Sequence, residues 1–521
     1  MSKTLKITLT TVLVVILLFF SSLVLTNILI KNKVEKFLLT RLPSHITQHH
    51  KGISLHTLGG TITINDLVVQ IANKKDTVVH TKIKLEKLIV QNVSYWDYLV
   101  NSEIHIETIK IKSPDLFYYS QNVHKTLDST HSSGPLKLYK PVVLDDLQID
   151  SANLYIYDNT LDSLMLYVEN SAVNISNIKV DKEIIKRRLP VEFERYSVNA
   201  DSVFVKANAY ENVTVSDVSI IDNRAVLNNL SLKTKLSKTA LSHKIKTERD
   251  HFDLKVNSIH IDGIDFGFDT RKLFVSSAFI KIETPELNIF RDKLVADDMS
   301  IKYLYSQSLR ELPFELTVDS IKIEKGAIKY REKVKANNQG GSIALGGLSA
   351  NLFNVSNTYK SPKQTKIDVS GFFMETTPFE SEWYFDVNNT NDDFNFKMTI
   401  GRLQAERLNR FTEPNLKVRL SGQTNKIYYT INGDNRRSKT DLRVNYEDFE
   451  ITVLNKYGNK KKWLLSTVAN LFVSKNSDDK SDNFREATVE VDRDKTKSVF
   501  NYIWLNLSKG LLESITGNGE K

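Results

Sequence analysis

Apolar and polar residues alternate along much of this chain, and one version of the pattern recurs. In residues 316–330, apolar residues occupy positions −5, −3, 0, +2, +7 and +9 relative to Ile321, with a polar stretch containing Gly326 before the last two. Apolar spacing of two, interrupted by Gly, Pro, Asn, Asp or Ser, is typical of half-buried strands separated by turns. The pattern therefore predicts a strand, a turn and a second strand.

The same offsets recur at other points in the chain. Ile109, Leu147 and Ile259 carry good copies and Val203 a weaker one, so successive copies lie 38, 56, 56 and 62 residues apart. This spacing is too irregular for a propeller or a helical array, and it favours a loose repeat of strand pairs. Because the step from −3 to 0 is odd, we expect a bulge or break at the acidic–serine pair before position 0.

A long apolar run near the start predicts a membrane anchor. Residues 7–30 carry no charge, and as a helix they would extend about 36 Å, enough to cross a hydrocarbon layer of roughly 30 Å. A cleaved signal peptide is the alternative, but the run is long for one and no small-residue cleavage motif closes it. Lysines on both sides leave the orientation open. The central residues of this expected single-pass helix are Leu13, Val14, Ile16, Leu17, Phe19 and Phe20.

The chain divides into five expected segments. Residues 1–6 form a short tail, 7–30 the transmembrane anchor, 31–52 an amphipathic helix or linker, 53–455 a body of repeated strands, and 456–521 a C-terminal cap with helices. The fold class is therefore mainly β. The final helix is expected to be amphipathic, because its apolar residues recur at steps of three and four: Phe500, Ile503, Trp504, Leu507 and Leu511.

A shorter apolar stretch in the cap has two interpretations. Residues 463–473 are too few to span a membrane, and they follow three lysines. They would form either a helix that covers the β body or an interfacial helix whose lysines contact lipid headgroups. The residues at this expected membrane interface are Lys460, Lys461, Lys462 and Trp463.

Composition excludes several classes of protein and site. The chain has no cysteine, which excludes a disulfide framework, a thiol nucleophile and cysteine-ligated metal sites. A net charge of +9 spread over 521 residues is mild, and no motif for nucleic-acid binding is present. His45, His49 and His50 have spacing that a metal could use on a helix, but they follow Pro43 and lack a nearby carboxylate. We therefore expect no metal, no cofactor and no nucleic-acid partner.

Acidic pairs are the nearest approach to a catalytic motif. They occur at residues 145–146, 297–298 and 478–479. Neighbouring residues on a strand face opposite ways, so such pairs do not make a general acid–base couple. The sequence carries none of the common hydrolase or metalloprotease motifs. We therefore expect that the protein is not an enzyme.

The order of these segments resembles that of AsmA-like proteins of Gram-negative envelopes, in a poorly characterised, shorter branch. The resemblance begins with the anchor and its short amphipathic helix and continues through two strand segments. At the far end, closing strands and two tail segments look similar to the same family. The segments that carry the likeness are Gly60–Val69, Ser102–Leu116, Asp441–Val453, Ser466–Leu471 and Arg493–Trp504 followed by Gly510.

This resemblance implies a fold, a place and a function. The fold would be a transmembrane helix followed by a long, curled antiparallel sheet, a taco-like β-groove with an apolar floor. The protein would be a single-pass inner-membrane protein with its bulk in the periplasm. It would bind or conduct acyl chains of phospholipid or another envelope lipid, in envelope lipid transport or homeostasis and outer-membrane biogenesis. Candidates for the groove floor are Ile109, Ile111, Leu147, Ile149, Ile259, Ile261, Ile321 and Ile323.

A structural role is the main alternative. An antiparallel sheet with one apolar face must cover that face, and this chain shows few convincing helices for the purpose. If its own side chains filled the β body, the protein would be a non-enzymatic scaffold or assembly factor that binds envelope proteins through exposed edges. A packed interior would support this scaffold, whereas a groove wide enough for acyl chains would argue against it.

Overall fold

The structure is a computed structural model of the 521-residue chain. It describes residues 42–454 and 483–516, apart from gaps at 57–58, 75, 124–139, 159–162, 188–189 and 270–271, together with Ile28 and Asn32. Within this described part, no helix combines the length and the apolar content needed to cross a membrane. The predicted anchor and interface residues lie outside the described residues: Leu13, Val14, Ile16, Leu17, Phe19, Phe20, Lys460, Lys461, Lys462 and Trp463.

The described residues are mainly β-strand, which confirms the predicted fold class. Their 24 strands belong to one mixed sheet. The chain divides into two compact units, which are described separately below. The first comprises residues 1–207 and 214–222, and the second comprises residues 208–213 and 223–521.

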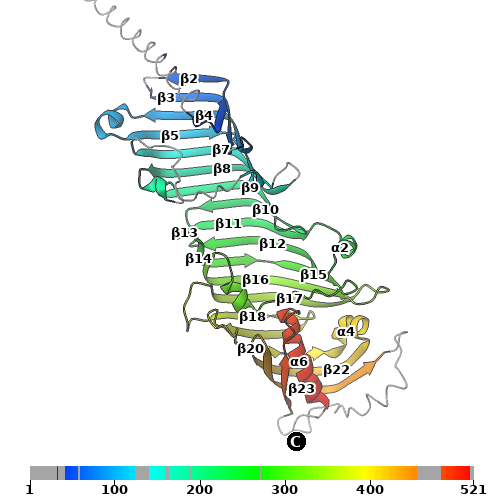
Figure 1. Cartoon of the computed structure of the whole chain (residues 1–521). Coiled ribbons are helices and arrows are strands. Elements are labelled where there is room, and N and C mark those ends of the chain that lie inside the picture. Colours follow the sequence, from blue (N-terminus) through cyan, green and yellow to red (C-terminus); the bar gives the residue numbers. More distant parts are fainter. Residues whose placement is uncertain are drawn as a thin grey trace, which may run out of the picture. The chain divides into compact units, whose positions relative to one another are not determined.

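The strands of the first unit follow one another in chain order (Figure 1). β1 and β2 both pair with β3, β4 pairs with β3 and with β5 and β6, and the order continues through β7, β8 and β9. Strands begin at Ile46, within the segment expected to be helix or linker. The elements are β1 (Ile46–His49), β2 (Gly52–His56), β3 (Thr61–Ala72), β4 (Val79–Val93), η2 (Asp97–Asn101), β5 (Ile104–Lys112), β6 (Asp115–Tyr119), η3 (Ser120–Asn122), β7 (Val142–Tyr157), β8 (Leu164–Val180), η4 (Ile184–Lys186), β9 (Arg195–Lys206) and β10 (Glu211–Ile221), whose first residues belong to the second unit.

The second unit continues the same kind of sheet and adds the longer helices. β12 pairs with β11, β14 and β15, and the order then runs through β16 to β20 and on to β22, β23 and β24. The elements are β11 (Arg224–Thr234), α2 (Lys238–Lys244), β12 (Asp250–Asp262), β13 (Asp265–Asp269), β14 (Lys272–Glu283), β15 (Glu286–Asp292), α3 (Tyr305–Arg310), β16 (Glu315–Lys333), β17 (Gly341–Ser356), β18 (Thr365–Phe373), β19 (Thr377–Phe385), β20 (Phe394–Ile400), β21 (Leu403–Gln404), η5 (Ala405–Leu408), α4 (Asn409–Leu416), β22 (Val418–Gly433), β23 (Arg437–Val453), β24 (Arg485–Asp492) and α6 (Val499–Thr516).

The predicted antiparallel sheet is wrong in one respect, because the sheet is mixed. β5 and β6 pair in parallel with β7, and β14 and β15 pair in parallel with β16. Period-two alternation is the same in both kinds of pair when one face is apolar, so the spacing could not reveal the direction. The connection from β15 to β16, residues 293–314 with α3, is long enough for the crossover that parallel strands require.

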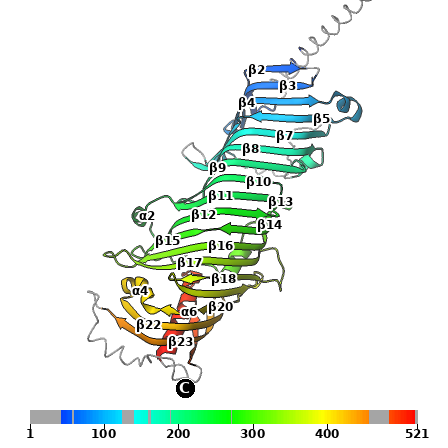
Figure 2. The ribbon, with the colours of Figure 1, turned by 180° about the vertical axis from the view of Figure 1, so that it is seen from behind.

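The largest packed core lies in the second unit, between its last strands and the helices. β19, β20, β23 and β24 alternate buried and exposed residues, as a covered sheet should. Ile431, Val444 and Tyr446 are each fully buried in this core. α6 packs across β22, β23 and β24, and α4 packs against β17 and β22 (Figures 1 and 2). In the first unit, the described residues form a much smaller cluster, with Ile53, Ile64 and Leu67 at its centre.

The C-terminal helix is confirmed, but its apolar residues do not all face one way. Ile503, Leu507 and Leu511 pack against the core. Phe500 and Trp504, at the same spacing, remain 69% and 38% exposed. The helix buries a narrower stripe than the sequence predicted, because the sheet beneath it contacts only one side of the helix.

A buried ion pair ties α3 to the β19–β20 connection. Asp392 is 1% exposed and accepts hydrogen bonds from the Arg310 guanidinium and the Ser306 hydroxyl, each at 2.9 Å. The same guanidinium donates to the carbonyl oxygens of Val387 and Asn389. Since a buried carboxylate without a partner is strongly unfavourable, this contact holds α3 against the core.

We predict that Arg310→Met lowers the free energy of unfolding of the second unit by about 3–5 kcal/mol, because it leaves the Asp392 carboxylate buried and unpaired. The matched control is Arg410→Met. Arg410 pairs with Glu375 at a site where both side chains are more than half exposed, and loss of such a pair changes stability by at most about 1 kcal/mol. Urea unfolding followed by tryptophan fluorescence measures both values. Equal effects of the two substitutions would contradict the assignment.

Candidate functional site

Two copies of the sequence repeat lie side by side in the first unit. β5 and β6 carry the copy around Ile109, and β7 carries the copy around Leu147. Their parallel register places every apolar position opposite its equivalent: Ile104–Val142, Ile106–Leu144, Ile109–Leu147, Ile111–Ile149, Leu116–Leu154 and Tyr118–Ile156. The repeat is therefore a structural unit in which neighbouring copies match position for position.

The second unit repeats this arrangement with a copy that the sequence analysis missed. β14 and β15 carry apolar residues around Ile280, and they pair in parallel with the copy around Ile321 on β16. Ile280 lies opposite Ile321, and Ile282 lies opposite Ile323. The copy escaped notice because Ser277 occupies its −3 position. Ile259 and Ile261 of β12 pair with Ile282 and Ile280 from the other side.

Each of these copies contains one left-handed residue at position +4, where the sequence predicted a turn. The residues are Ser113, Ser151, Gly263, Thr284 and Lys325, with φ between 48° and 66°. In β7 and β16 the strand continues through this point with a shift of register, so the predicted turn is there a bulge. In the other three copies the strand breaks into two.

The expected irregularity before position 0 takes a milder form. The ladders skip one pair at Asp145 and one at Asp319, while the register on either side stays unchanged. The neighbouring Asn177 and Asn354, which stand opposite, have positive φ. In β7 and β16 the register of the ladder shifts after position +2 instead. The left-handed residue at position +4 is therefore the main point at which the strand changes the face to which its next side chains point.

Positions 0 and +2 extend across the first unit as what we call the first apolar row. In ladder order from β2 to β9, each strand contributes two residues that pair with two on the next strand. The row consists of Ile53 and Leu55, Ile62 and Ile64, Leu88 and Val90, Ile109 and Ile111, Leu147 and Ile149, Val173 and Ile175, and Tyr196 and Val198. Four of the predicted groove residues lie in this row.

The second apolar row is built in the same way within the second unit. It runs from β11 through β12, β14, β16 and β17 to β18. Its members are Ala225 and Leu227, Ile259 and Ile261, Ile280 and Ile282, Ile321 and Ile323, Ala350 and Leu352, and Ile367 and Val369. The other four predicted groove residues lie in this row, and the structure therefore brings together each predicted set within its unit.

The residues between these positions lie on the opposite face of the sheet, which is polar on most strands but apolar at Ile89 of β4 and Val226 of β11. Successive side chains of a strand point to opposite sides, so residue +1 of each copy lies on the other face. In the second unit, His260, Lys281, Lys322, Asn351 and Asp368 follow one another across the ladder. In the first unit the corresponding residues of β5, β7, β8 and β9 are Lys110, Gln148, Asn174 and Ser197.

Ion pairs reinforce the polar face beside the second row. The Lys281 ammonium lies 2.5 Å from Glu283 and 3.2 Å from Glu324, and Lys322 lies 2.7 Å from Glu324. Hydrogen bonds from Lys281 and Ser258 lower the pKa of Glu283 to about 2. The charges on this face satisfy one another in solvent, and the sheet is amphipathic.

The eight predicted groove residues are all half-buried. None of Ile109, Ile111, Leu147, Ile149, Ile259, Ile261, Ile321 and Ile323 belongs to the buried core. The helices that pack on the sheet, α4 and α6, lie over β17 and β22–β24 rather than over β5, β7, β12 or β14. The two rows are therefore continuous apolar surfaces that remain partly open in the described chain.

The sequence analysis also missed copies of the repeat on strands that run the other way. On β8 the apolar residues Val180, Ile178, Ile175, Val173, Val168 and Leu166 follow the repeat offsets in reverse order. β17 does the same with Val355, Leu352, Ala350, Leu345 and Ile343. A search with the reversed template would have found both strands, since an antiparallel neighbour must match the repeat from its opposite end.

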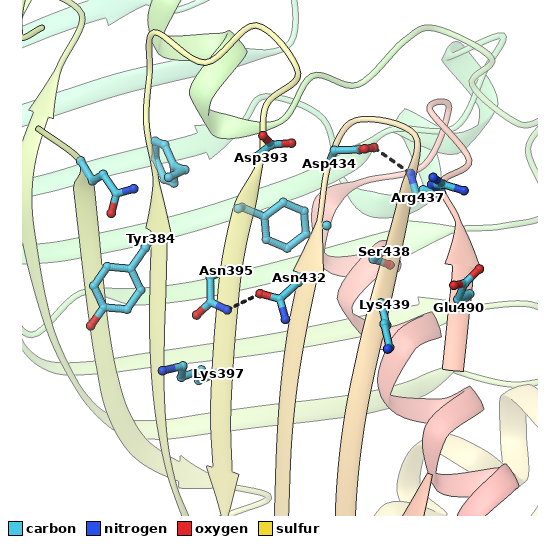
Figure 3. A pocket seen from close by; sticks show the side chains of 14 residues that line it. Tyr384, Asp393, Asn395, Lys397, Asn432, Asp434, Arg437, Ser438, Lys439 and Glu490 are labelled. Atoms are coloured by element: carbon cyan, nitrogen blue, oxygen red, sulfur yellow. Dashed lines mark hydrogen bonds between the residues drawn. The ribbon is translucent and has the colours of Figure 1, made fainter. Parts of the chain in front are cut away.

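A separate hollow of about 750 Å³ lies on the polar side of the last strands. Tyr384, Asn395, Lys397, Asn432 and Lys439 line it from β19, β20, β22 and β23 (Figure 3). The Asn395 amide donates a hydrogen bond to the Asn432 side-chain oxygen at 2.6 Å. None of the eight predicted residues lines it, and its walls mix acidic and basic side chains. Such a surface is unsuited to acyl chains.

The described acidic pairs engage separate partners, as neighbours on a strand or in a loop do. Asp145 contacts His105 at 3.0 Å, whereas Asp146 accepts from the Ser176 hydroxyl at 2.9 Å. Asp297 contacts Lys497, and Asp298 contacts Lys302. The third pair, residues 478–479, lies outside the described residues. Within the described chain, no three His, Asp or Glu side chains gather as metal ligands would.

Comparison with known proteins adds no relative. No protein-family model matches this sequence, and no curated protein is significantly similar to it. The function proposed below therefore rests on the geometry of the chain and on the resemblance stated above.

We predict that Gly263→Val disturbs the second row at its left-handed position. Gly263 has φ +66°, and a Cβ atom there would lie 2.9 Å from the Cβ of Ala278. Strain at such a position should lower the free energy of unfolding by about 1–3 kcal/mol. Gly346→Val on β17 is the matched control, because a Cβ there meets nothing within 4 Å. Thermal or urea unfolding compares the two. A smaller loss for Gly263→Val than for Gly346→Val would contradict this role of position +4.

Proposed function

We propose that this protein holds lipid acyl chains along its two apolar rows, as an AsmA-like, membrane-anchored protein of the periplasm. The observation that carries the proposal is the half-burial of all eight predicted residues, each an Ile or a Leu, within the two continuous apolar rows. Full burial of one such side chain is worth about 1.5–3 kcal/mol. A row of such side chains left partly open to water therefore lacks several times that free energy of burial, unless something apolar covers it.

Acyl chains fit this surface better than a polar ligand does. The rows present aliphatic side chains without a polar group at positions 0 and +2 from β12 to β17. Acyl chains need no specific hydrogen bonds and can lie along a continuous apolar strip, whereas polar ligands require convergent donors and acceptors. The charged face behind the rows keeps the sheet soluble, so lipid and water would each meet the face that suits it.

The remaining parts of the proposal follow the resemblance. Residues 7–30 would anchor the chain in the inner membrane as a single pass, with the β body in the periplasm. The sheet would curl around its lipid as a β-groove, and the protein would act in envelope lipid transport or homeostasis without enzymatic chemistry. Phospholipid or another envelope lipid would be the ligand, and envelope proteins would be its partners.

The scaffold alternative is favoured by one observation, the packed core of the second unit. There the protein's own side chains fill the space between the last strands and the helices, and Ile427, Leu442 and Val444 are almost fully buried. This self-filled part overlaps the end of the second row, because Leu348 of β17 belongs to the core and the row members Ile367 and Val369 of β18 pack against it. We therefore assign the core to the closing end of the body and keep the lipid proposal for the rows.

Photo-crosslinking in cells tests whether lipid contacts the face of the sheet that carries the two rows. A photoreactive amino acid at Ile321 or Ile109 should form an adduct with phosphate-labelled phospholipid, because these side chains belong to the apolar rows. The matched controls are the next residues along each strand, Lys322 and Lys110, which lie on the polar face. Adducts of equal yield at Ile321 and Lys322 would contradict a lipid-bearing face.

A charge placed in the second row should displace the lipid. We predict that Ile259→Asp together with Ile321→Asp lowers the lipid adduct yield at a third row position, such as Ile280, at least about tenfold, since burying a carboxylate among acyl chains costs more than 1.4 kcal/mol. His260→Asp together with Lys322→Asp changes charge on the polar face of the same strands and should leave the yield unchanged. Unaltered yield in the first pair would refute the proposal.

A further inference from the structure

The turn between β4 and β5 carries an exposed group of apolar side chains away from both rows. It projects beyond the ends of its two strands in both views (Figures 1 and 2). Within residues 95–100, the exposed fractions are 48% for Tyr95, 71% for Trp96, 49% for Tyr98, 77% for Leu99 and 55% for Val100. Five large, exposed apolar residues within six positions are unusual on a folded surface and mark an interaction site.

The turn is held from beneath by a chain of charged contacts. Asp97, the polar residue within the run, lies 3.0 Å from Nδ1 of His105 on β5, and Nε2 of His105 lies 3.0 Å from Asp145 on β7. The Asn101 amide donates to Asp97 at 2.6 Å, and the backbone N–H of Asp97 donates to the Ser94 hydroxyl at 3.2 Å. These contacts fix the base of the turn while its apolar side chains point outward.

The chemistry of the contacts that link Asp97, His105 and Asp145 agrees with this supporting role. Both imidazole nitrogens face carboxylate oxygens, an arrangement that suits the doubly protonated ring. Hydrogen bonds to Asp145 and Asp97 raise the pKa of His105, and those from Ser94, His105 and Asn101 lower the pKa of Asp97. Ser102 closes the turn with φ +56° and a backbone hydrogen bond to the Asp97 carbonyl. The turn is thus preorganised.

The composition of the turn suits the boundary between lipid and water. Trp and Tyr prefer that boundary because their rings are apolar and their polar atoms can reach water. Lys140 lies over the Tyr98 ring, 3.7 Å from its centroid, and its ammonium also contacts the Tyr98 carbonyl. A cation beside exposed aromatic and aliphatic side chains could contact lipid phosphate while Leu99 and Val100 enter the acyl boundary.

The place of the turn in the chain supports a bilayer rather than a partner protein. β4 is separated from β1 only by β3, so the turn lies on the second and third strands beyond the edge, within roughly 10–14 Å of it at the usual strand spacing. β1 begins at Ile46, soon after the apolar run that ends at Ile30. A projecting, convex turn can enter a bilayer surface, whereas protein hot spots require a complementary pocket.

We propose that residues 95–100 form a docking turn that inserts Trp96, Leu99 and Val100 into the surface of a phospholipid bilayer. The bridge from Asp97 through His105 to Asp145 positions this turn. The proposal is separate from acyl-chain binding by the rows, because it concerns a different surface and requires no lipid in a groove.

Because the chain has no cysteine, a single introduced cysteine can be labelled specifically. The full chain carries one cysteine with an environment-sensitive nitrobenzoxadiazole label, either Val100→Cys in the turn or Ile221→Cys at the end of β10. These positions are 55% and 58% exposed and so serve as a matched pair. The protein is reconstituted into vesicles of phosphatidylethanolamine and phosphatidylglycerol, with and without bromine on the acyl chains. Bromine quenches only a label that contacts the acyl region.

We expect the label at Val100→Cys to shift to shorter wavelength and to lose fluorescence in brominated vesicles, while the label at Ile221→Cys does neither. Adding Trp96→Ser and Leu99→Ser, at side chains that are 71% and 77% exposed, should abolish the quenching at position 100. Equal responses at both positions would overturn the proposal. A blue shift without bromine quenching would show that protein covers the turn and would overturn it as well.

Discussion

An amphipathic sheet must cover its apolar face, and this constraint shapes the whole described chain. Ile, Leu and Val at two positions of each repeat line one face, and Lys, Asn, Gln and His line the other. The register that aligns Ile109 with Leu147, and Ile280 with Ile321, makes these positions continuous across strands. The repeat thus converts a local sequence pattern into an extended apolar surface.

The chain meets this constraint in two different ways. At its C-terminal end, α6 and the neighbouring strands fully bury the centre of the apolar face, at Leu442, Val444 and Tyr446. Along the rows, the described chain places no comparable layer, and the predicted groove residues remain half-buried. The same sheet therefore contains its own comparison: covered strands show strict alternation of buried and exposed residues, whereas row strands such as β5 and β16 show extended half-burial. Lipid is the covering that we propose for the second case.

Much of this arrangement could be predicted from sequence, because it depends on local spacing. The strands, the equivalence of the copies around Ile109, Leu147, Ile259 and Ile321, and the C-terminal helix all follow from periodicity. Strand direction did not follow, since alternation is identical in parallel and antiparallel pairs. The copy around Ile280 was missed because a serine replaced one apolar residue, and the contacts of His105 with two acidic residues depend on pairing between β5 and β7. The exposure of Phe500 depends on which side of α6 contacts the sheet.

The central claim is that acyl chains cover the rows, and the most direct measurement is mass spectrometry of co-purifying lipid. The chain without its first 30 residues would be secreted into the periplasm of a Gram-negative host and isolated without detergent. The account predicts phospholipid at a reproducible ratio to protein, retained through size-exclusion chromatography. A folded protein that carries no lipid would contradict the account and would favour a scaffold whose β body needs no ligand.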